Sequence, residues 1–294
     1  MDKERISFFD LLRGIAILLV FINHIPHNSY LINEGTLFIY KKIFLFGTYG
    51  VQLFYIVSAI TLMISLYRKN QIDVKKFYIK RIFRIVPIFY LGILLHILYF
   101  SFFSQYNNEL LDLKNIILNV SFLNNIIPPS NDLILGGSTI ATEMNFYLIL
   151  PFFYFFINSY LKSLIFSLLY LILIFLFNRA SFNLFDGDLF GNANFYRTIF
   201  VQMYVFSLGL NFFYIFKEKL LENEKIINLK NLNKIIPHIF IAILIFIFEK
   251  SEPEYFYFRN MLFVSTVFFI IVSIFFTLKL NFNNNIILKL IEKI

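Results

Sequence analysis

The chain has 294 residues, of which 59% are hydrophobic and 15% are charged. Soluble globular domains carry about 25% charged residues, so this composition excludes a soluble globule and indicates an integral membrane protein in contact with the lipid bilayer. The formal net charge is +8, but Lys and Arg gather in short connections between apolar runs, a pattern that is typical of membrane topology signals and excludes nucleic acid as the expected partner. The absence of cysteine excludes disulfides, thiolate metal sites and a cysteine nucleophile.

Eight apolar runs of membrane length, or close to it, follow one another along the chain. A helical span needs roughly 20 residues. The runs lie at residues 8–26, 43–66, 82–104, 143–160, 162–178, 196–216, 235–248 and 259–279. We therefore predict an all-α fold, a polytopic membrane helix bundle with about eight to nine transmembrane helices. No repeat or linker divides the chain, so residues 1–294 are expected to form a single transmembrane domain.

The first run, FFDLLRGIAILLVFINHIP, holds Arg13 and His24, which are 11 positions apart. Eleven steps of about 100° close three helical turns with roughly 20° left over, so the two side chains share one face, about 16 Å apart along the axis. Ionisable groups in a membrane-length run are costly, and they indicate a functional site. Asp10, one turn before Arg13, is expected to pair with that Arg.

Loop charges predict the orientation of the helices. Lys and Arg crowd the connection after the second run, at residues 68–84, which predicts that this connection and the amino terminus are cytoplasmic. Arg13 then lies toward the cytoplasmic side and His24 toward the outer side. The Lys-rich segment 217–234 also reads as inside, and the acidic segment 249–258 as outside. This alternation requires that the short run 116–127 enters and leaves on one side; the alternatives are a re-entrant segment and a short broken span.

Residues 77–87, FYIKRIFRIVP, place Lys80, Arg81 and Arg84 on neighbouring positions of a helix. One interpretation is a positive-inside anchor. The other is a phosphate clamp, because the planar fork of Arg suits phosphate oxygens. The composition does not choose between them.

Two further stretches carry small or polar residues. In residues 50–63, Gly50, Ser58 and Ala59 would allow close helix approach. In residues 131–151, Glu143 is expected at the mouth of a helix. There its carboxylate would either be stabilised by the helix dipole, or be buried next to an imidazole that it orients and with which it shares proton transfer.

The other three histidines give weaker signals. His27 could share the outer mouth with His24, whereas His96 and His238 stand alone in apolar runs, where a His is more often structural. There is no HExxH or comparable ligand spacing, so we predict no metal site. No P-loop or GxGxxG is present either, and no permanently bound cofactor is expected.

Four blocks together, in this order, resemble the membrane-bound acyltransferase-3 family, which includes O-antigen and exopolysaccharide O-acyltransferases. FFDLLRGIAILLVFINH resembles the family's first helix, with an Arg, ten residues and a His. GVQLFYIVSAITL resembles GVDLFFVISGFLI, FYIKRIFRIVPIFY resembles FYxRRxxRIxPxYY, and ATEMNFYLILP resembles SVEEQFYLLWP. The blocks span residues 7–151.

The chain departs from the family pattern at several positions. Gln52 replaces an Asp, Ala59 replaces a Gly, and Ser138 stands where a Trp usually opens the last block. At residue 294 the family usually begins an approach to a last helix, so we expect that helix to be missing.

The resemblance implies transfer of an acyl group, commonly acetyl, from acetyl-CoA or another acyl-CoA to a hydroxyl of a surface glycan or lipid-linked saccharide. Arg81, Arg84 and Lys80 would bind the donor, and Arg13 would meet its phosphates or carbonyl. His24 would act as general base or carry the acyl group transiently, with Glu143 assisting. The expected location is the bacterial inner membrane. Two alternatives stay open: a polysaccharide exporter, and an inactive family member, suggested by Gln52, Ser138 and the missing helix.

Overall fold

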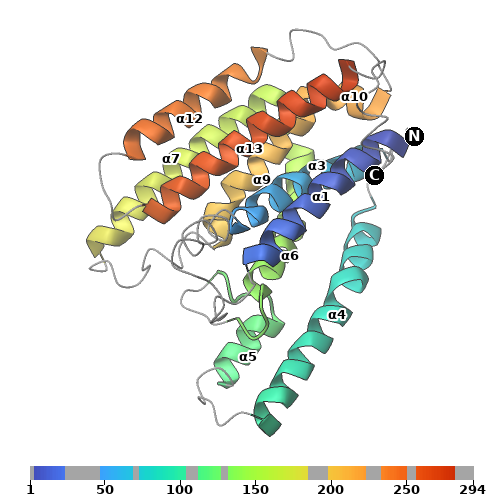
Figure 1. The fold of residues 1–294 in the computed structure, drawn as a ribbon, viewed down its shortest axis with the longest axis vertical. Helices are drawn as coiled ribbons and strands as arrows, with labels where there is room; N and C mark the ends of the chain where they lie inside the picture. Colours follow the sequence, from blue (N-terminus) through green and yellow to red (C-terminus); the bar gives the residue numbers. More distant parts are fainter. Residues whose placement is uncertain are drawn as a thin grey trace, which may run out of the picture. The chain divides into compact units, whose positions relative to one another are not determined.

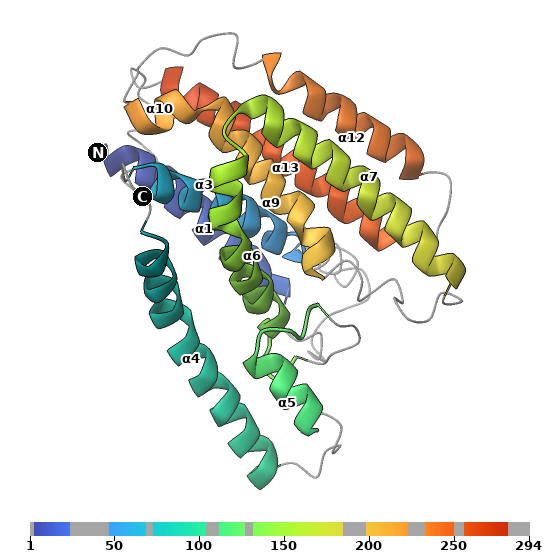
Figure 2. The same ribbon diagram turned by 180° about the vertical axis from the view of Figure 1, so that it is seen from behind.

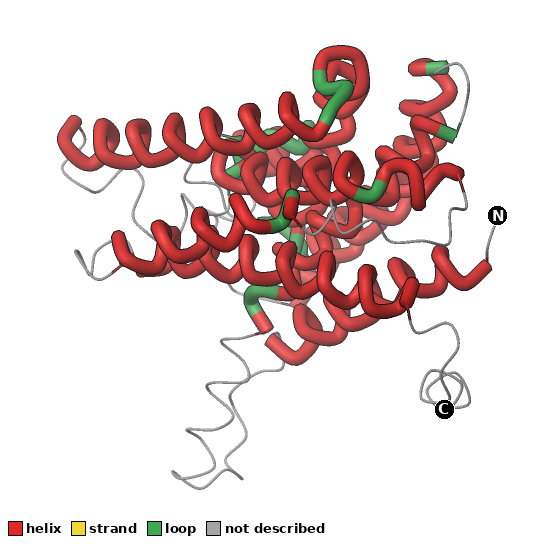
Figure 3. Tube along the Cα trace, turned by 90° about the horizontal axis from the view of Figure 1, so that it is seen from above, coloured by secondary structure: helices red, strands yellow, loops and turns green. Residues whose placement is uncertain are grey.

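The structure is a computed structural model that describes residues 3–23, 47–68, 73–103, 112–126, 132–184, 198–222, 233–249 and 256–281. All regular structure within these ranges is helical and none of it is strand (Figure 3). The all-α prediction is therefore confirmed for the described part of the chain. The helices, labelled in Figure 1, are α1 (Lys3–Asn23), α3 (Gly50–Tyr67), α4 (Val74–Phe103), α5 (Leu113–Val120), α6 (Gly137–Phe156), α7 (Tyr160–Leu184), α9 (Ile199–Ile215), α10 (Lys217–Glu222), α12 (Ile236–Glu249) and α13 (Phe256–Asn281).

Each of the eight predicted apolar runs coincides with one of the longer helices, but several helices begin earlier than predicted, α4 and α6 by the widest margins. Helix α4 begins at Val74 rather than at residue 82, and α6 begins at Gly137 rather than at residue 143. An apolar run marks only the part of a helix that lipid or protein covers, and the hydrogen-bonded backbone continues beyond it through polar residues. The basic positions of residues 77–87 therefore lie within α4 itself.

Four described helices are long and apolar enough to cross a membrane. They cover Gly50–Tyr67, Val74–Tyr99, Gly137–Phe156 and Asn260–Leu278, while Tyr160–Leu176, Ile199–Ile215 and Ile236–Ile247 are apolar but shorter. Helix α1 has 21 residues, and Asp10 and Arg13 lie within it. The described helices thus support a membrane protein, while the predicted count of eight to nine spans is not established.

The chain divides into two compact units, unit 1 (Met1–Arg68 with Val205–Ile294) and unit 2 (Lys69–Tyr204). In unit 1, α1 lies against α3, and α12 lies beside α13 (Figures 1 and 2). A Cβ added at Gly50 would lie 2.6 Å from the Ala16 carbonyl oxygen, and one at Gly47 would lie 2.5 Å from that of Leu19. Only glycine permits so close an approach of two helices, so the predicted role of Gly50 is confirmed.

The other side of α3 packs against α9 in the same manner. A Cβ added at Gly209 would lie 2.6 Å from the Ala59 Cβ and 2.6 Å from the Ile56 carbonyl oxygen. The methyl group of Ala59, which stands where the family pattern has glycine, thus faces a glycine on the neighbouring helix. Ala59 is fully buried, in agreement with the expected close approach.

Five phenylalanines gather at one end of unit 1. Phe276 of α13 lies 5.7 Å from Phe8, 5.3 Å from Phe212 and 5.1 Å from Phe216, between ring centroids, and Phe9 joins the same cluster. At this end α1 begins and α9 and α13 end, and Tyr67 at the end of α3 bonds Tyr214 at 3.0 Å. The start of α1 and the ends of α3, α9 and α13 therefore lie together in unit 1; that this end faces the cytoplasm stays a prediction.

In unit 2, a hydrophobic cluster joins α4, the turn after α5 and the start of α6. It comprises Phe89, Ile93, Phe122, Leu133 and Ala141. Helix α5 has 8 residues, a length of about 12 Å against a hydrocarbon thickness of about 30 Å. It cannot cross a bilayer by itself, so the described part of the run 116–127 is a short helix followed by turns rather than a span.

Asparagine side chains satisfy the irregular backbone beside α5. Asn145 of α6 donates to the Phe122 carbonyl oxygen at 2.9 Å and to Asn125 Oδ1 at 3.0 Å. Asn125 Nδ2 in turn donates to the Thr142 hydroxyl, and Asn119 Oδ1 accepts from the Leu133 backbone N–H at 3.1 Å. All four of these polar side chains are buried, as irregular backbone requires wherever water is excluded. The network fixes the start of α6, the helix that carries Glu143.

Candidate functional site

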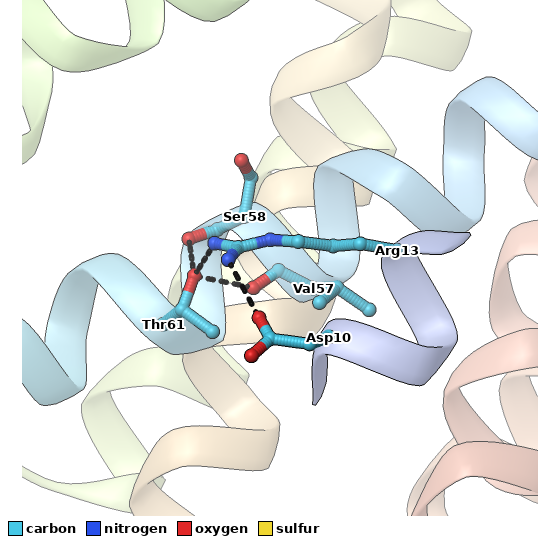
Figure 4. A network of polar contacts seen from close by, with 5 residues as sticks. All are labelled: Asp10, Arg13, Val57, Ser58 and Thr61. Atoms are coloured by element: carbon cyan, nitrogen blue, oxygen red, sulfur yellow. Dashed lines mark hydrogen bonds and ion pairs between the residues drawn. The ribbon is translucent and has the colours of Figure 1, made fainter. Parts of the chain in front are cut away.

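Arg13 lies on α1 and reaches across to α3 (Figure 4). Its Nη2 donates to the Thr61 hydroxyl, and its Nη1 lies 3.5 Å from Asp10 Oδ1, within the ion-pair range. The expected pairing of Asp10 with Arg13 is therefore confirmed. The Arg13 side chain is 29% exposed, and three of its five N–H groups have no partner among the described residues. Arg13 can thus still bind an anion or a carbonyl oxygen.

His24, the proposed base, lies outside the described residues, as does His27. Helix α1 ends at Asn23, whose Cβ would be 3.0 Å from a Cβ built on Gly47. The shared face of Arg13 and His24 therefore stays a prediction, while α1 as a helix up to Asn23 is established.

Gln52, which replaces the acidic residue of the family pattern, is buried in the first turns of α3. Oriented to satisfy its hydrogen bonds, its amide nitrogen donates to the carbonyl oxygens of Tyr49 and Thr48, both at 3.2 Å. A carboxylate has no proton to donate there. The replacement is therefore matched to the backbone of this chain.

Glu143 lies on α6, and the expectation that it sits at the helix mouth is wrong. The helix is capped by Gly136, which has a φ of 78°, and no acidic residue lies in its first turn. Because α6 starts at Gly137, Glu143 falls in the second turn, where it is 9% exposed and accepts a hydrogen bond from the Tyr147 hydroxyl. Of the two readings from the sequence, the buried carboxylate is the one that its position favours.

Arg81 of α4 meets the same part of α6. Its guanidinium carbon lies 5.5 Å from the centre of the Tyr147 ring and 5.7 Å from that of Phe77, both within cation–π range. Unit 2 thus places an arginine and a buried carboxylate beside one tyrosine.

Lys80 and Arg84 are exposed, whereas Arg81 is half-buried. Exposed cations at the end of an apolar helix fit both interpretations made from the sequence, the lipid anchor and the phosphate clamp. The contact of Arg81 with Tyr147 is not explained by an anchor. It ties one member of the basic cluster to the carboxylate of α6.

The other described histidines lie elsewhere. His238 is fully buried, with its ring 4.2 Å from that of Phe269 and its Nε2 3.0 Å from Asn211 Nδ2. These contacts are those of a packed structural residue. His96 is half-buried on α4. Within the described ranges no three His, Cys, Asp or Glu side chains gather as metal ligands would.

The comparison with known families tests the resemblance found in the sequence. Residues 6–294 match the acyltransferase-3 family model, described as an acyltransferase domain. The chain belongs to the acyltransferase-3 family. The match covers both units, and the suspected resemblance is confirmed. The final segment IILKLIEKI, where the family usually begins an approach to a last helix, lies outside the described residues. No curated protein and no solved structure is significantly similar to this acyltransferase-3 chain.

Two residues with a hydroxyl, Thr61 and Tyr147, contact proposed site residues of this acyltransferase-3 chain within its described part but were not predicted as functional. Thr61 lies one turn beyond Val57 on α3. Its contact with Arg13 depends on how α1 and α3 are aligned, which the sequence near Thr61 does not show. Tyr147 does carry a sequence signal, since it lies four positions after Glu143 and therefore on the same face of a helix. A search for polar partners at this spacing would have found it.

Proposed function

We propose that this chain is a membrane-bound O-acyltransferase that transfers an acyl group, commonly acetyl, from cytoplasmic acyl-CoA to a hydroxyl of a surface glycan or lipid-linked saccharide. The observation that carries the proposal is the family match over residues 6–294, within which Arg13, Arg81, Arg84 and Glu143 stand at the positions of the family blocks. The membrane proposed is the bacterial inner membrane, with the amino terminus in the cytoplasm.

The donor is proposed to bind through its phosphates. Arg81, Arg84 and Lys80 offer a cluster of cations on the first turns of α4, the end that follows the basic connection. Arginine binds phosphate oxygens through two parallel N–H groups, which gives geometry as well as charge. Arg81 keeps its guanidinium over Tyr147, so its position is already restrained before a ligand arrives.

In the proposed reaction the acceptor hydroxyl oxygen attacks the thioester carbonyl carbon. The new C–O bond forms as the C–S bond breaks, and the hydroxyl proton passes to His24 and then to the departing thiolate, which leaves as free coenzyme A. Alternatively, His24 carries the acyl group between donor and acceptor. Arg13, through its remaining N–H groups, would stabilise the oxyanion or hold the donor.

The test is transfer of label in membranes that contain the protein. Radiolabelled acetyl-CoA is expected to yield a glycan or lipid-linked sugar that carries base-labile label, and His24→Ala should abolish it. His96→Ala is the matched control and should retain labelling. Labelling that persists in His24→Ala would contradict the role of His24.

The same assay addresses the two alternatives. An exporter would move glycan across the membrane without adding ester, so base-labile acetate on the product counts against it. An inactive protein, suggested by Gln52 and Ser138, would show neither result. Ser138 donates to Asp132 Oδ2 at 2.9 Å, so this departure, like that of Gln52, has a defined partner in the structure.

A further inference from the structure

The contact between Arg13 and Thr61 stands apart from what the family blocks imply. In the family pattern GVDLFFVISGFLI, leucine stands at the position that Thr61 occupies in this chain. Leucine has no hydrogen-bonding group, so a polar partner for Arg13 at this position is a property of this chain. Thr61 is half-buried within an otherwise apolar stretch of α3.

The Thr61 hydroxyl can only accept from Arg13. Its oxygen lies 2.9 Å from the Val57 carbonyl oxygen and 3.1 Å from that of Ser58, both on its own helix (Figure 4). A hydroxyl has one proton to donate and two lone pairs to accept with. Because the proton is directed at these carbonyl groups, the lone pairs face the guanidinium of Arg13.

The second partner of Arg13 holds it less firmly. The Asp10 carboxylate is 57% exposed and lies at 3.5 Å, one turn away on the same helix. A separation of 3.5 Å is longer than the roughly 2.7–3.2 Å that is typical of N–H···O hydrogen bonds, so this contact directs the guanidinium less strongly. The directional restraint on the guanidinium therefore comes chiefly from Thr61.

Two of the five N–H groups of Arg13 are used, one from each terminal nitrogen. The Nε–H and the second N–H of each terminal nitrogen have no partner among the described residues. A guanidinium presents these groups in one plane, so fixing Nη2 on Thr61 fixes the direction of the others. The arrangement leaves a partly exposed, oriented fork that suits a carbonyl or phosphate oxygen.

We propose that Thr61 is a positioning residue that orients Arg13 toward the acyl donor. The proposal rests on the proposed function, because it assumes that Arg13 meets acyl-CoA. Thr61 itself touches no reacting atom; it acts through the guanidinium.

The test measures steady-state transfer with the purified full chain at varied acyl-CoA concentration. Thr61→Val removes the hydroxyl and keeps the branched shape, and it should lower kcat/KM for the donor about tenfold, the factor expected for one lost hydrogen bond to a charged group. The loss should lie mainly in KM. Thr61→Ser keeps a hydroxyl at this position, unlike Thr61→Val, and should retain most of the wild-type activity.

Thr277→Val is the matched control. Its hydroxyl donates to the Ser273 carbonyl oxygen at 2.7 Å, as Thr61 does to Val57, but it lies on α13 and has no arginine partner among the described residues. It should leave the donor kinetics unchanged. In an Arg13→Gln background, Thr61→Val should have no further effect, which tests action through Arg13 even if one single variant is poorly folded.

The outcomes separate the two proposals. Equal donor kinetics in wild type and Thr61→Val, or an undiminished effect in the Arg13→Gln background, would overturn the role of Thr61 alone. A wild-type protein that transfers no acyl group would overturn the proposed function and, with it, this role.

Discussion

The packing of α1 on α3 makes Gly50 a position where one added methyl group should destabilise the fold. A Cβ on Gly50 would lie 2.6 Å from the Ala16 carbonyl oxygen, 2.8 Å from the Leu19 Cβ and 3.0 Å from the Val20 nitrogen. Carbon atoms prefer separations of about 3.5–4.0 Å, so the methyl must move by roughly 0.7 Å or more. Two of these three atoms are backbone, and the helices themselves must separate.

The expected cost of Gly50→Ala is that of overpacking, about 1–3 kcal/mol. Gly14→Ala on α1 is the control, because nothing lies within 4 Å of its added Cβ. There the better helix propensity of alanine should stabilise by up to about 1 kcal/mol. The two substitutions are chemically identical and should shift Tm in opposite directions, measured by thermal unfolding in detergent. Equal Tm shifts for the two variants would refute the close approach of α1 and α3.

Three further predictions concern unit 2. Tyr147→Phe should keep the ring beneath the Arg81 guanidinium but remove the donor to Glu143, which should lower the free energy of unfolding by about 1.5–3 kcal/mol. Tyr78→Phe is the control: it loses a bond to the neutral Leu148 backbone carbonyl and should cost less. Equal shifts in Tm for the two variants would argue against the buried pair of Tyr147 and Glu143. Asn145→Ala should lower the free energy of unfolding by about 2 kcal/mol or more, because the Phe122 carbonyl oxygen and Asn125 Oδ1 both lose their donor. A Tm equal to that of wild type would contradict a stabilising role of this network. Arg84→Gln should raise KM for acyl-CoA with little change in kcat and weaken the dependence of KM on salt, whereas an unchanged KM would support the anchor interpretation.

The helices could be predicted from the sequence because apolar length dominates the signal in a membrane protein. Their starts could not, since polar residues such as those before residue 82 continue a helix that the apolar run no longer marks. This error moved Glu143 from a helix mouth to a buried second turn. The small residues Gly50 and Ala59 were read correctly, because only close helix packing accounts for them in such a run.

The partners of the site residues depend on register between helices, which no local pattern encodes. Arg13 finds Thr61, 48 positions away, only because α1 and α3 pack antiparallel through glycine. Likewise Arg81 meets Tyr147 because α4 and α6 lie together. The asparagines beside α5 were visible as polar residues in an apolar run, but their hydrogen bonds follow from a turn geometry that the sequence does not display.

Acyl transfer itself can be measured directly in proteoliposomes that contain the purified chain, with radiolabelled acetyl-CoA and a glycan or lipid-linked saccharide acceptor. The account predicts label on the acceptor that mild base releases, that depends on His24 and that survives His96→Ala. Acceptor that remains unlabelled while the purified wild-type chain is folded would contradict it.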